Sequence, residues 1–325
     1  MAARELLRDA VERAPVAGHV GKSGASLERV RVRDGRVLLV KRVDAITDFT
    51  VALTGGGPCV EYRLWRDGIL DQLPRGVGHA VLDAWVDGDE TVLVLRDLGD
   101  TVLTWEDHLD AGRTRWLVAR VAALHRHFLG APPPGLAPLE LTVTVFAPER
   151  MGSLEQPGEP LPGLVRRGWE LFDELVGQDV VTAVHALHDD PTPLVAGLLA
   201  GPVTLLHGDL ATVNMAPAGD DLVLIDWAMA SVGPGAVDIA RFVAGCASSV
   251  DLSREELLAA YREAAGPAYD DRSMQLGLLT GLVWLGWNKA LDAVDHPDPA
   301  MRERERADLQ WWVDRGRRAL EEGAL

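Results

Sequence analysis

The sequence predicts an α+β fold with a β-rich first part and a larger, mostly helical second part. Before residue 96, apolar and polar residues alternate in several runs, which is the pattern of half-buried strands. From Thr114 onward the apolar residues recur at helical spacing. We therefore expect a bilobal chain, with a β-rich lobe over residues 1–98 and a helical lobe over residues 99–325.

The first lobe is expected to hold five strands and one helix. Ser26–Arg33 and Arg36–Val43 both alternate, and the Asp34-Gly35 pair between them is a strong hairpin signal. The other elements whose positions the pattern indicates are a helix over Cys59–Leu70 and strands over His79–Val86 and Thr91–Leu95.

The second lobe is expected to be helical around two short strands. Leu117, Val121, Leu124 and Phe128 form an apolar stripe at helical spacing. The short apolar runs Val203–Leu206 and Leu222–Ile225 each lead straight into polar residues, so we expect two strands that present side chains at their carboxyl ends. Further helices are expected over residues 164–176, 251–265, 274–291 and 303–322.

Composition limits the classes of function. The chain has 32 Lys and Arg against 49 Asp and Glu, a formal net charge of −17, which argues against binding to nucleic acid or to an anionic membrane. Its two cysteines, Cys59 and Cys246, are too few for a disulfide framework or a four-cysteine zinc site. The first residues lack an apolar signal core and no apolar run is long enough to span a bilayer, so we expect a cytoplasmic protein.

The strongest chemical signal lies at the ends of the two short strands. Asp209 follows Val203–Leu206, Asn214 comes five residues later, and Asp226 follows the second apolar run. Phosphoryl transfer needs one carboxylate to orient the attacking hydroxyl, and an amide oxygen and a second carboxylate to hold Mg²⁺ against the phosphates. Hard oxygen ligands suit Mg²⁺. The spacing therefore predicts a site for phosphoryl transfer.

These residues resemble the motifs of the aminoglycoside phosphotransferase and choline kinase-like family of small-molecule kinases, which have a protein-kinase-like bilobal fold. The run His207-Gly208-Asp209 through Asn214 resembles the family's catalytic loop, and Asp226-Trp227 resembles its metal-binding motif. The segment 233–240, with Asp238, resembles the one that usually follows, and Leu124-His125 resembles a recurrent pair. The resemblance covers residues 18–245 and implies an enzyme that uses ATP and Mg²⁺.

The resemblance implies a role for each matching residue of the loop. Asp209 would be the catalytic base or would orient the hydroxyl, and Asn214 and Asp226 would hold the magnesium ions. His207 would brace the catalytic loop rather than carry a proton. Asp238 would tie down the metal loop.

The same resemblance assigns the nucleotide site to the first lobe. Lys41 would contact the phosphates, and Glu61, near the start of the next helix, would hold that lysine; Arg42 points to the opposite face of the strand. Residues 21–26, with Gly21, Ser23 and Gly24, would cover the phosphates, because small residues let backbone N–H groups approach them. At the hinge, the carbonyl of Arg96 and the N–H of Leu98 would bind the purine, ATP by default, with GTP also compatible.

The acceptor is less defined by the sequence. The −17 charge and the carboxylates of Asp189, Asp190, Glu263 and Asp270 suit a cationic acceptor, such as an aminoglycoside or another amino sugar or amino alcohol. Asp189 and Asp190 fit a simple turn before Pro191 equally well.

The alternative to an active kinase is a nucleotide-binding pseudokinase that acts as a regulatory or scaffold module. A metal-hydrolase interpretation is weaker, because no His-Glu-x-x-His occurs. We expect His185 and His188 to lie on the surface or in the substrate cleft rather than to bind a metal. Four tryptophans, at positions 284, 287, 311 and 312, are expected mainly in the core.

Overall fold

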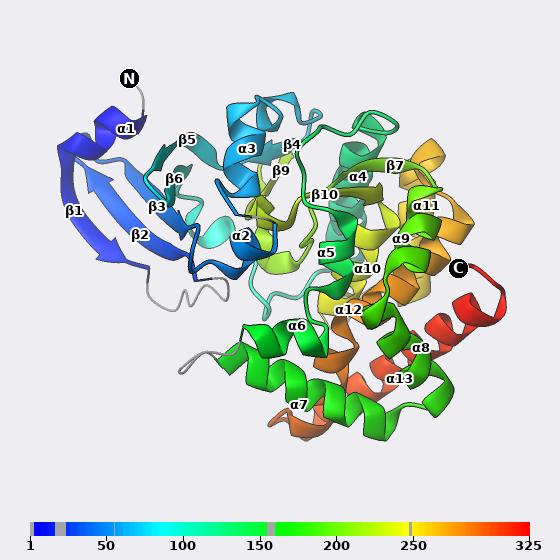
Figure 1. Cartoon of the computed structure of the whole chain (residues 1–325). Helices are drawn as coiled ribbons and strands as arrows, with labels where there is room; N and C mark the ends of the chain where they lie inside the picture. Colours follow the sequence, from blue (N-terminus) through cyan, green and yellow to red (C-terminus); the bar gives the residue numbers. More distant parts are fainter. Residues whose placement is uncertain (1–2, 17–23, 55, 155–159, 247–248) are drawn as a thin grey trace. The chain divides into compact units, whose positions relative to one another are not determined.

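The computed structural model describes residues 3–16, 24–54, 56–154, 160–246 and 249–325 (Figure 1). The chain forms two compact units. The first unit comprises residues 1–107, 133–137 and 212–230, and the second comprises residues 108–132, 138–211 and 231–325. In the described part of the chain, no helix is both long and apolar enough to cross a membrane.

The first unit is built on a five-stranded antiparallel sheet in the order β1-β2-β3-β6-β5. The predicted hairpin is confirmed as β2 and β3, with a turn at Gly35, whose φ of +90° suits glycine. The sheet and its flanking elements are β1 (Ala10–Pro15), β2 (Ser26–Val32), β3 (Val37–Asp44), β5 (Val81–Asp87), β6 (Glu90–Arg96), α1 (Ala3–Leu6), α2 (Phe49–Leu53) and α3 (Val60–Arg66).

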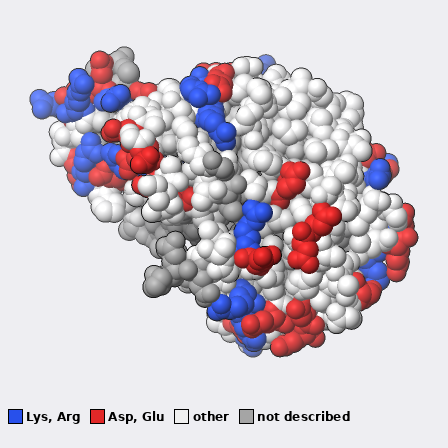
Figure 2. All heavy atoms as spheres, in the orientation of Figure 1, with Lys and Arg blue, Asp and Glu red and all other residues white. Residues whose placement is uncertain are grey.

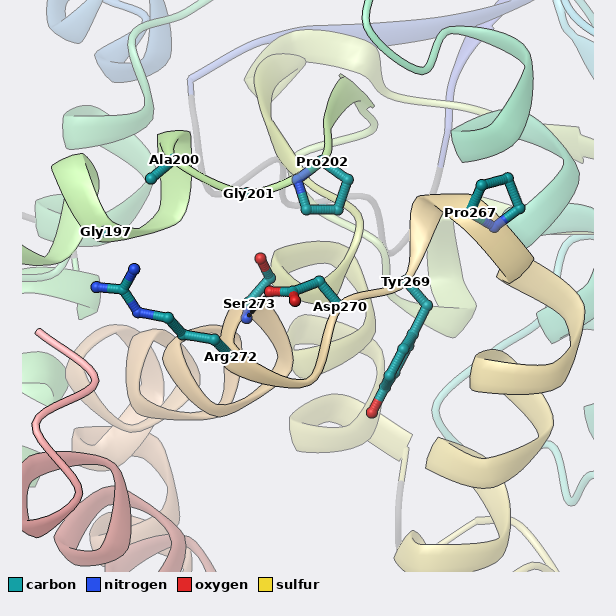
Figure 3. Close-up of a pocket in the computed structure, with 9 residues that line it drawn as sticks. All are labelled: Gly197, Ala200, Gly201, Pro202, Pro267, Tyr269, Asp270, Arg272 and Ser273. Carbon is teal, nitrogen blue, oxygen red and sulfur yellow. Dashed lines mark hydrogen bonds between the residues drawn. The ribbon is translucent and has the colours of Figure 1, made fainter.

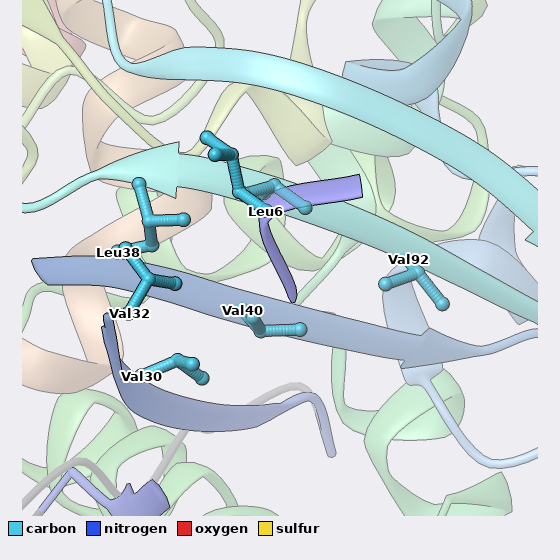
Figure 4. Close-up of a cluster of buried hydrophobic side chains, with 7 residues drawn as sticks. Leu6, Val30, Val32, Leu38, Val40 and Val92 are labelled. Carbon is cyan, nitrogen blue, oxygen red and sulfur yellow. The ribbon is translucent and has the colours of Figure 1, made fainter. Parts of the chain in front are cut away.

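One face of this sheet carries an apolar cluster (Figure 4). Alternate residues of β2, β3 and β6 point to this face, and Leu6 of α1 packs against them. Lys41 follows the buried Val40 on β3, so it lies on the opposite face of the sheet. The cluster consists of Leu6, Val30, Val32, Leu38, Val40, Val92 and Val94.

A second, three-stranded sheet of the first unit is assembled from distant parts of the sequence. β4 (Val77–His79) pairs in parallel with β9 (Asp221–Leu224), and β9 pairs in antiparallel register with β8 (Met215–Ala218). The predicted strand at Leu222–Ile225 is thus confirmed as β9, shifted by one residue. The carboxyl end of β9 leads directly to Asp226.

The second unit is mostly helical, and α12 (Asp271–Asp295) lies at its centre. Side chains along most of α12 are buried, and it packs against α7, α10 and α13. At Gly277 a Cβ would come within 2.8 Å of Ala236, so glycine permits the close approach of α12 to the start of α10. The remaining elements are α4 (Ala111–His127), α5 (Leu139–Thr144), α6 (Pro148–Ser153), α7 (Pro160–Leu175), α8 (Gln178–Asp189), α9 (Thr192–Leu199), β7 (Val203–Leu206), β10 (Ser231–Pro234), α10 (Ala236–Cys246), α11 (Arg254–Ala265) and α13 (Pro299–Glu321).

A buried charge cluster connects α12 with α13. Nζ of Lys289 lies 2.9 Å from Glu305 and 2.7 Å from Asp308, and all three side chains are buried. Arg254 of α11 also pairs with Asp308. Burial opposes the charge of Lys289, but the two carboxylates raise its pKa above the usual value. The cluster fixes α13 against the central helix.

Candidate active site

The first unit brings together three of the predicted site residues. Nζ of Lys41 lies 3.0 Å from Oε2 of Glu61 and 2.7 Å from Oδ1 of Asp226. β3 presents Lys41 on the face of the sheet opposite the apolar cluster. Glu61 lies in the first turn of α3, where the helix dipole favours a carboxylate. Asp226 follows β9. A strand, a helix and a loop distant in sequence thus meet at one ammonium group.

Burial and charge at this cluster have opposite effects on Lys41. The side chains of Lys41 and Glu61 are 12% and 3% exposed, whereas that of Asp226 is 46% exposed. Burial disfavours the ammonium ion, but the carboxylates of Asp226 and Glu61 outweigh it and raise the pKa of Lys41 well above its usual value. Lys41 therefore remains charged at neutral pH and offers a fixed cation.

Asp226 has an unusual backbone conformation. With φ at 61°, it is the one non-glycine residue with a positive φ in the described ranges. Such a conformation costs free energy and tends to occur at functional sites. In this conformation Asp226 accepts a hydrogen bond from Nζ of Lys41 through Oδ1.

Asn214 lies beside Asp226 through the register of β8 and β9. Asn214 ends a short 3-10 helix just before β8, and Met215 pairs with Leu224. The N–H of Ile225 donates to the carbonyl of Asn214 at 3.0 Å, which ties the two strand ends together directly before Asp226. One pair of strands thus brings the backbone of Asn214 next to the residue that precedes Asp226. The amide oxygen of Asn214 and the carboxylate of Asp226 are hard donors of the kind that Mg²⁺ prefers.

The second unit holds the predicted catalytic loop at the carboxyl end of β7. Asp238, near the start of α10, accepts the backbone N–H of His207 at 2.8 Å and that of Gly208 at 2.9 Å. Gly208 has a φ of +83°, a conformation that favours glycine. The N–H of Asp209 lies 3.4 Å from Nδ1 of the fully buried His207. These contacts define the backbone on both sides of the glycine.

Two further buried side chains extend this support. Nε2 of His125 lies 3.1 Å from Oδ2 of Asp238, and Nδ1 of His125 lies 2.9 Å from the hydroxyl of Tyr261. The three side chains are at most 1% exposed. Although burial opposes its ionisation, the contacts with His125 and the N–H donors lower the pKa of Asp238. The hydrogen bonds from Tyr261 to His125 and from His125 to Asp238 therefore link α11 and α4 to the predicted catalytic loop.

Arg241 is a contact that the sequence analysis missed. Its Nε donates to Oδ1 of Asp209 at 2.7 Å. Arg241 lies three residues after Asp238 on α10, so both project from one face of the helix. This i, i+3 spacing could have indicated the contact, because a helix that contacts the loop through Asp238 places the residue three positions later near the same loop.

The other residues predicted for the nucleotide site are Gly21, Ser23, Gly24, Arg96 and Leu98. Gly21 and Ser23 lie outside the described residues, as does Lys22 between them. Gly24 has a φ of +98° beside the carbonyl of Thr47. Arg96 ends β6, and its guanidinium donates to the carbonyl of His79, while Leu98 accepts the N–H and hydroxyl of Thr101.

Two of the four acidic residues considered for a cationic acceptor, Asp190 and Asp270, have structural partners. Asp190 accepts the N–H of Thr192 at 3.0 Å, as expected for a turn before α9. Asp270 caps α12 by accepting the N–H of Ser273 at 2.7 Å. Asp270 and Ser273 also line a hollow of about 400 Å³ next to Pro202, at the opposite end of β7 from His207 (Figure 3). These contacts support the turn interpretation for Asp190 and a capping role for Asp270.

The histidines and tryptophans of the second unit mainly serve packing. Three of the four tryptophans, at 284, 287 and 312, are buried, as expected for core residues. His188 donates through Nε2 to the carbonyl of Val283 at 2.8 Å, and His185 contacts Asp173 at 2.7 Å. No group of three or more His, Cys, Asp or Glu suited to a metal ion occurs among the residues that the structure describes.

Comparison with known proteins identifies relatives of this architecture. The model of a phosphotransferase enzyme family matches residues 63–275. No curated protein matches the chain in sequence.

Solved structures give the same picture at the level of the fold. An aminoglycoside phosphotransferase from Alicyclobacillus acidocaldarius has a TM-score of 0.51 and 15% identity, over 99% of this chain and 95% of that one. Choline kinase LicA from Streptococcus pneumoniae has a TM-score of 0.51 and 13% identity, over 94% of each chain. The aminoglycoside phosphotransferase APH(3'')-Id from Streptomyces rimosus, in complex with ADP and streptomycin, has a TM-score of 0.51 and 19% identity, over 88% of this chain and 98% of that one. The predicted protein-kinase-like fold is confirmed.

Proposed function

Because the chain belongs to the phosphotransferase enzyme family, whose members are small-molecule kinases, we propose that it transfers the γ-phosphate of ATP to a hydroxyl group of a small molecule. The observation that supports this most is the cluster of Lys41, Glu61 and Asp226. It holds a permanent cation beside a partly exposed carboxylate, which is what the phosphates of a metal-bound nucleotide require.

Asp209 is proposed as the base that accepts or orients the proton of the attacking hydroxyl. The contacts of Asp238 and His207 with the loop support this role, since they define the backbone from which Asp209 projects. We propose that His207 supports the backbone of this loop and does not carry a proton. Phosphoryl transfer passes through a loose transition state, so precise placement of such groups supplies much of the rate enhancement.

Asn214 and Asp226 are proposed as the Mg²⁺ ligands. When bound, Mg²⁺ neutralises phosphate charge during transfer. The backbone hydrogen bond between Ile225 and Asn214 supports the assignment, because it brings the residue that precedes Asp226 next to Asn214. Lys41 would contribute a second positive charge to the phosphates, held in place by Glu61.

The purine and the phosphate-covering loop are proposed at the positions that the sequence suggested. The carbonyl of Arg96 and the N–H of Leu98 would contact the base, with ATP preferred and GTP compatible, and residues 21–26 would cover the phosphates. The division into lobes at residue 98 belongs to the same proposal.

The acceptor is proposed to be an amino sugar or amino alcohol, for example an aminoglycoside. The −17 charge of the chain supports a cationic acceptor. Acidic side chains lie in several small groups on the face that Figure 2 shows, some with basic side chains beside them, so the charge is spread over that face. The solved relatives include a complex with streptomycin.

A panel of acceptors tests this proposal. The full chain would be incubated with ATP and Mg²⁺ and with aminoglycosides, amino alcohols, neutral sugars and nucleosides, and ADP formation and the phosphorylated product would be measured. We expect acceptor-dependent ADP formation and one mole of phosphate in the product per mole of ADP. ATP binding without transfer to any acceptor would favour the pseudokinase alternative.

A further inference from the structure

A partly buried ion pair joins Arg241 to Asp209 within the second unit. Nε of Arg241 lies 2.7 Å from Oδ1 of Asp209, and the two side chains are 13% and 34% exposed. The guanidinium also lies over the indole ring of Trp284, 5.8 Å from the ring centroid. Arg241 is thus held from two sides, by its own helix α10 and by α12.

We propose that Arg241 is a positioning residue for phosphoryl transfer, which holds the carboxylate of Asp209 in the orientation that receives the proton of the acceptor hydroxyl. The inference rests on the proposed function, because Arg241 acts here only through Asp209. It adds a residue to the reaction that lies outside the catalytic and metal motifs.

The backbone and the side chain of Asp209 have different contacts. Asp238 and His207 fix the backbone around Gly208, and the ion pair with Arg241 restrains the side-chain torsions of Asp209. A charge-assisted bond from a guanidinium does so with a defined direction, because the N–H donors of arginine lie in one plane. The ring of Trp284 and the burial of Arg241 limit the motion of the guanidinium.

The exposure of the pair argues for geometry rather than stability as its main contribution. Asp209 retains one third of its side-chain exposure, and ion pairs that are open to water stabilise a fold only weakly. A displacement of a reacting group by about 1 Å, in contrast, costs a rate of the order of a hundredfold. Loss of Arg241 should therefore affect turnover more than folding.

The chain offers a closely matched control. Arg254 also pairs with an aspartate, Asp308, and lies over a tryptophan, Trp311, at 5.4 Å from the ring centroid. Neither Arg254 nor its partners belong to the proposed site. Arg254→Met therefore removes the same kind of ion pair and ring contact from the same unit without touching the catalytic loop.

The experiment compares Arg241→Met, Arg241→Lys, Asp209→Asn and Arg254→Met in the full chain, with the best acceptor of the panel. For Arg241→Met we expect kcat to fall roughly ten- to a hundredfold, with the KM for ATP within about threefold of the wild-type value. Arg241→Lys keeps a cation within reach of Asp209 and should recover kcat to within about tenfold of wild type. Arg254→Met should lower Tm and leave kcat unchanged.

The outcomes separate this inference from the proposed function. If Asp209→Asn abolishes turnover but both Arg241 variants retain the wild-type kcat, Arg241 has no positioning role. If Asp209→Asn itself retains turnover, the proposed function is wrong. If Arg241→Met does not fold, Arg241→Gln decides: a folded glutamine variant with the wild-type kcat would overturn the inference, because Asp209 would then be oriented without a guanidinium.

Discussion

Lys41 and Asp226, 185 residues apart in the sequence, lie 2.7 Å apart in the first unit. The contact depends on the parallel pairing of β4 with β9, because that pairing brings the segment 212–230 into the unit that contains β3. Lys41 on the five-stranded sheet and Asp226 at the end of the three-stranded sheet therefore meet because both sheets belong to one unit, and not through sequence proximity.

Lys41→Met should weaken nucleotide binding. The substitution removes the fixed cation and leaves the buried Glu61 without its partner, so we expect the Kd for ATP to rise at least about tenfold, as for a lost charged hydrogen bond. Calorimetric titration with ATP measures this. Arg42→Met is the matched control, because Arg42 is adjacent but pairs with Glu90 on the other side of the strand. An equal loss in both variants would contradict the assignment of Lys41.

Asp226→Asn should remove the dependence of nucleotide binding on Mg²⁺. The amide can still accept a hydrogen bond from Lys41, but it lacks the charge that holds a divalent cation. We expect the Kd for ATP to be the same with Mg²⁺ and with EDTA, and Asn214→Ala to give a smaller effect. Asp221→Asn, an exposed change at the start of β9, should behave as wild type. Wild-type Mg²⁺ dependence in Asp226→Asn would exclude this carboxylate as a metal ligand.

Tyr261→Phe should destabilise the second unit. The change deletes the hydroxyl that bonds to Nδ1 of His125 and leaves a buried polar atom unpaired, which costs about 1–3 kcal/mol of the free energy of unfolding. Denaturant unfolding measures the loss. Tyr269→Phe, whose hydroxyl bonds to Asp271 at an exposed position, should cost less. If the two variants lose the same stability, the chain from Tyr261 to Asp238 does not support the loop.

The stability of the fold should fall at acid pH through His188. Burial lowers its pKa from 6.5 to about 4, so protons bind more readily to the unfolded chain than to the folded one. This contribution to stability is complete above pH 6.5 and is lost as the pH falls toward 4, by about 3 kcal/mol.

Unfolding experiments from pH 7 to pH 4 on His188→Gln check this contribution. Glutamine can donate to the carbonyl of Val283 without titrating, so the variant should show a flatter pH dependence than wild type. His185→Gln serves as the control from the same helix. A wild-type slope in His188→Gln would show that another group causes the acid instability.

The sequence was most informative where local pattern and chemistry coincide. The hairpin of β2 and β3 followed from alternation and an Asp-Gly turn, and β7 was found at Val203–Leu206 as expected. The helix expected over Cys59–Leu70 ends earlier, at Arg66, because the chain reverses at Gly68, which has a φ of +69°.

Other features depend on contacts that no local pattern shows. β1 is an edge strand in which five of six residues are exposed, and its apolar residues do not alternate with polar ones, so no strand pattern reveals it. Arg241 contacts Asp209 from α10, and Tyr261 of α11 is linked to the loop at Asp209 through His125 of α4 and Asp238. The contacts of Arg241 with Asp209 and of Tyr261 with His125 follow from the three-dimensional structure and cannot be inferred from residue types.

We propose that Asp209 accepts or orients the proton of the acceptor hydroxyl, while ATP binds at Lys41, Glu61 and Asp226. The most direct measurement is ATP binding and phosphate transfer on the same preparation of Asp209→Asn. We expect the Kd for ATP to stay within about threefold of wild type, while transfer to the best acceptor falls by at least about a thousandfold, as for loss of a positioned base. Transfer at the wild-type rate by Asp209→Asn would show that Asp209 is not the catalytic base.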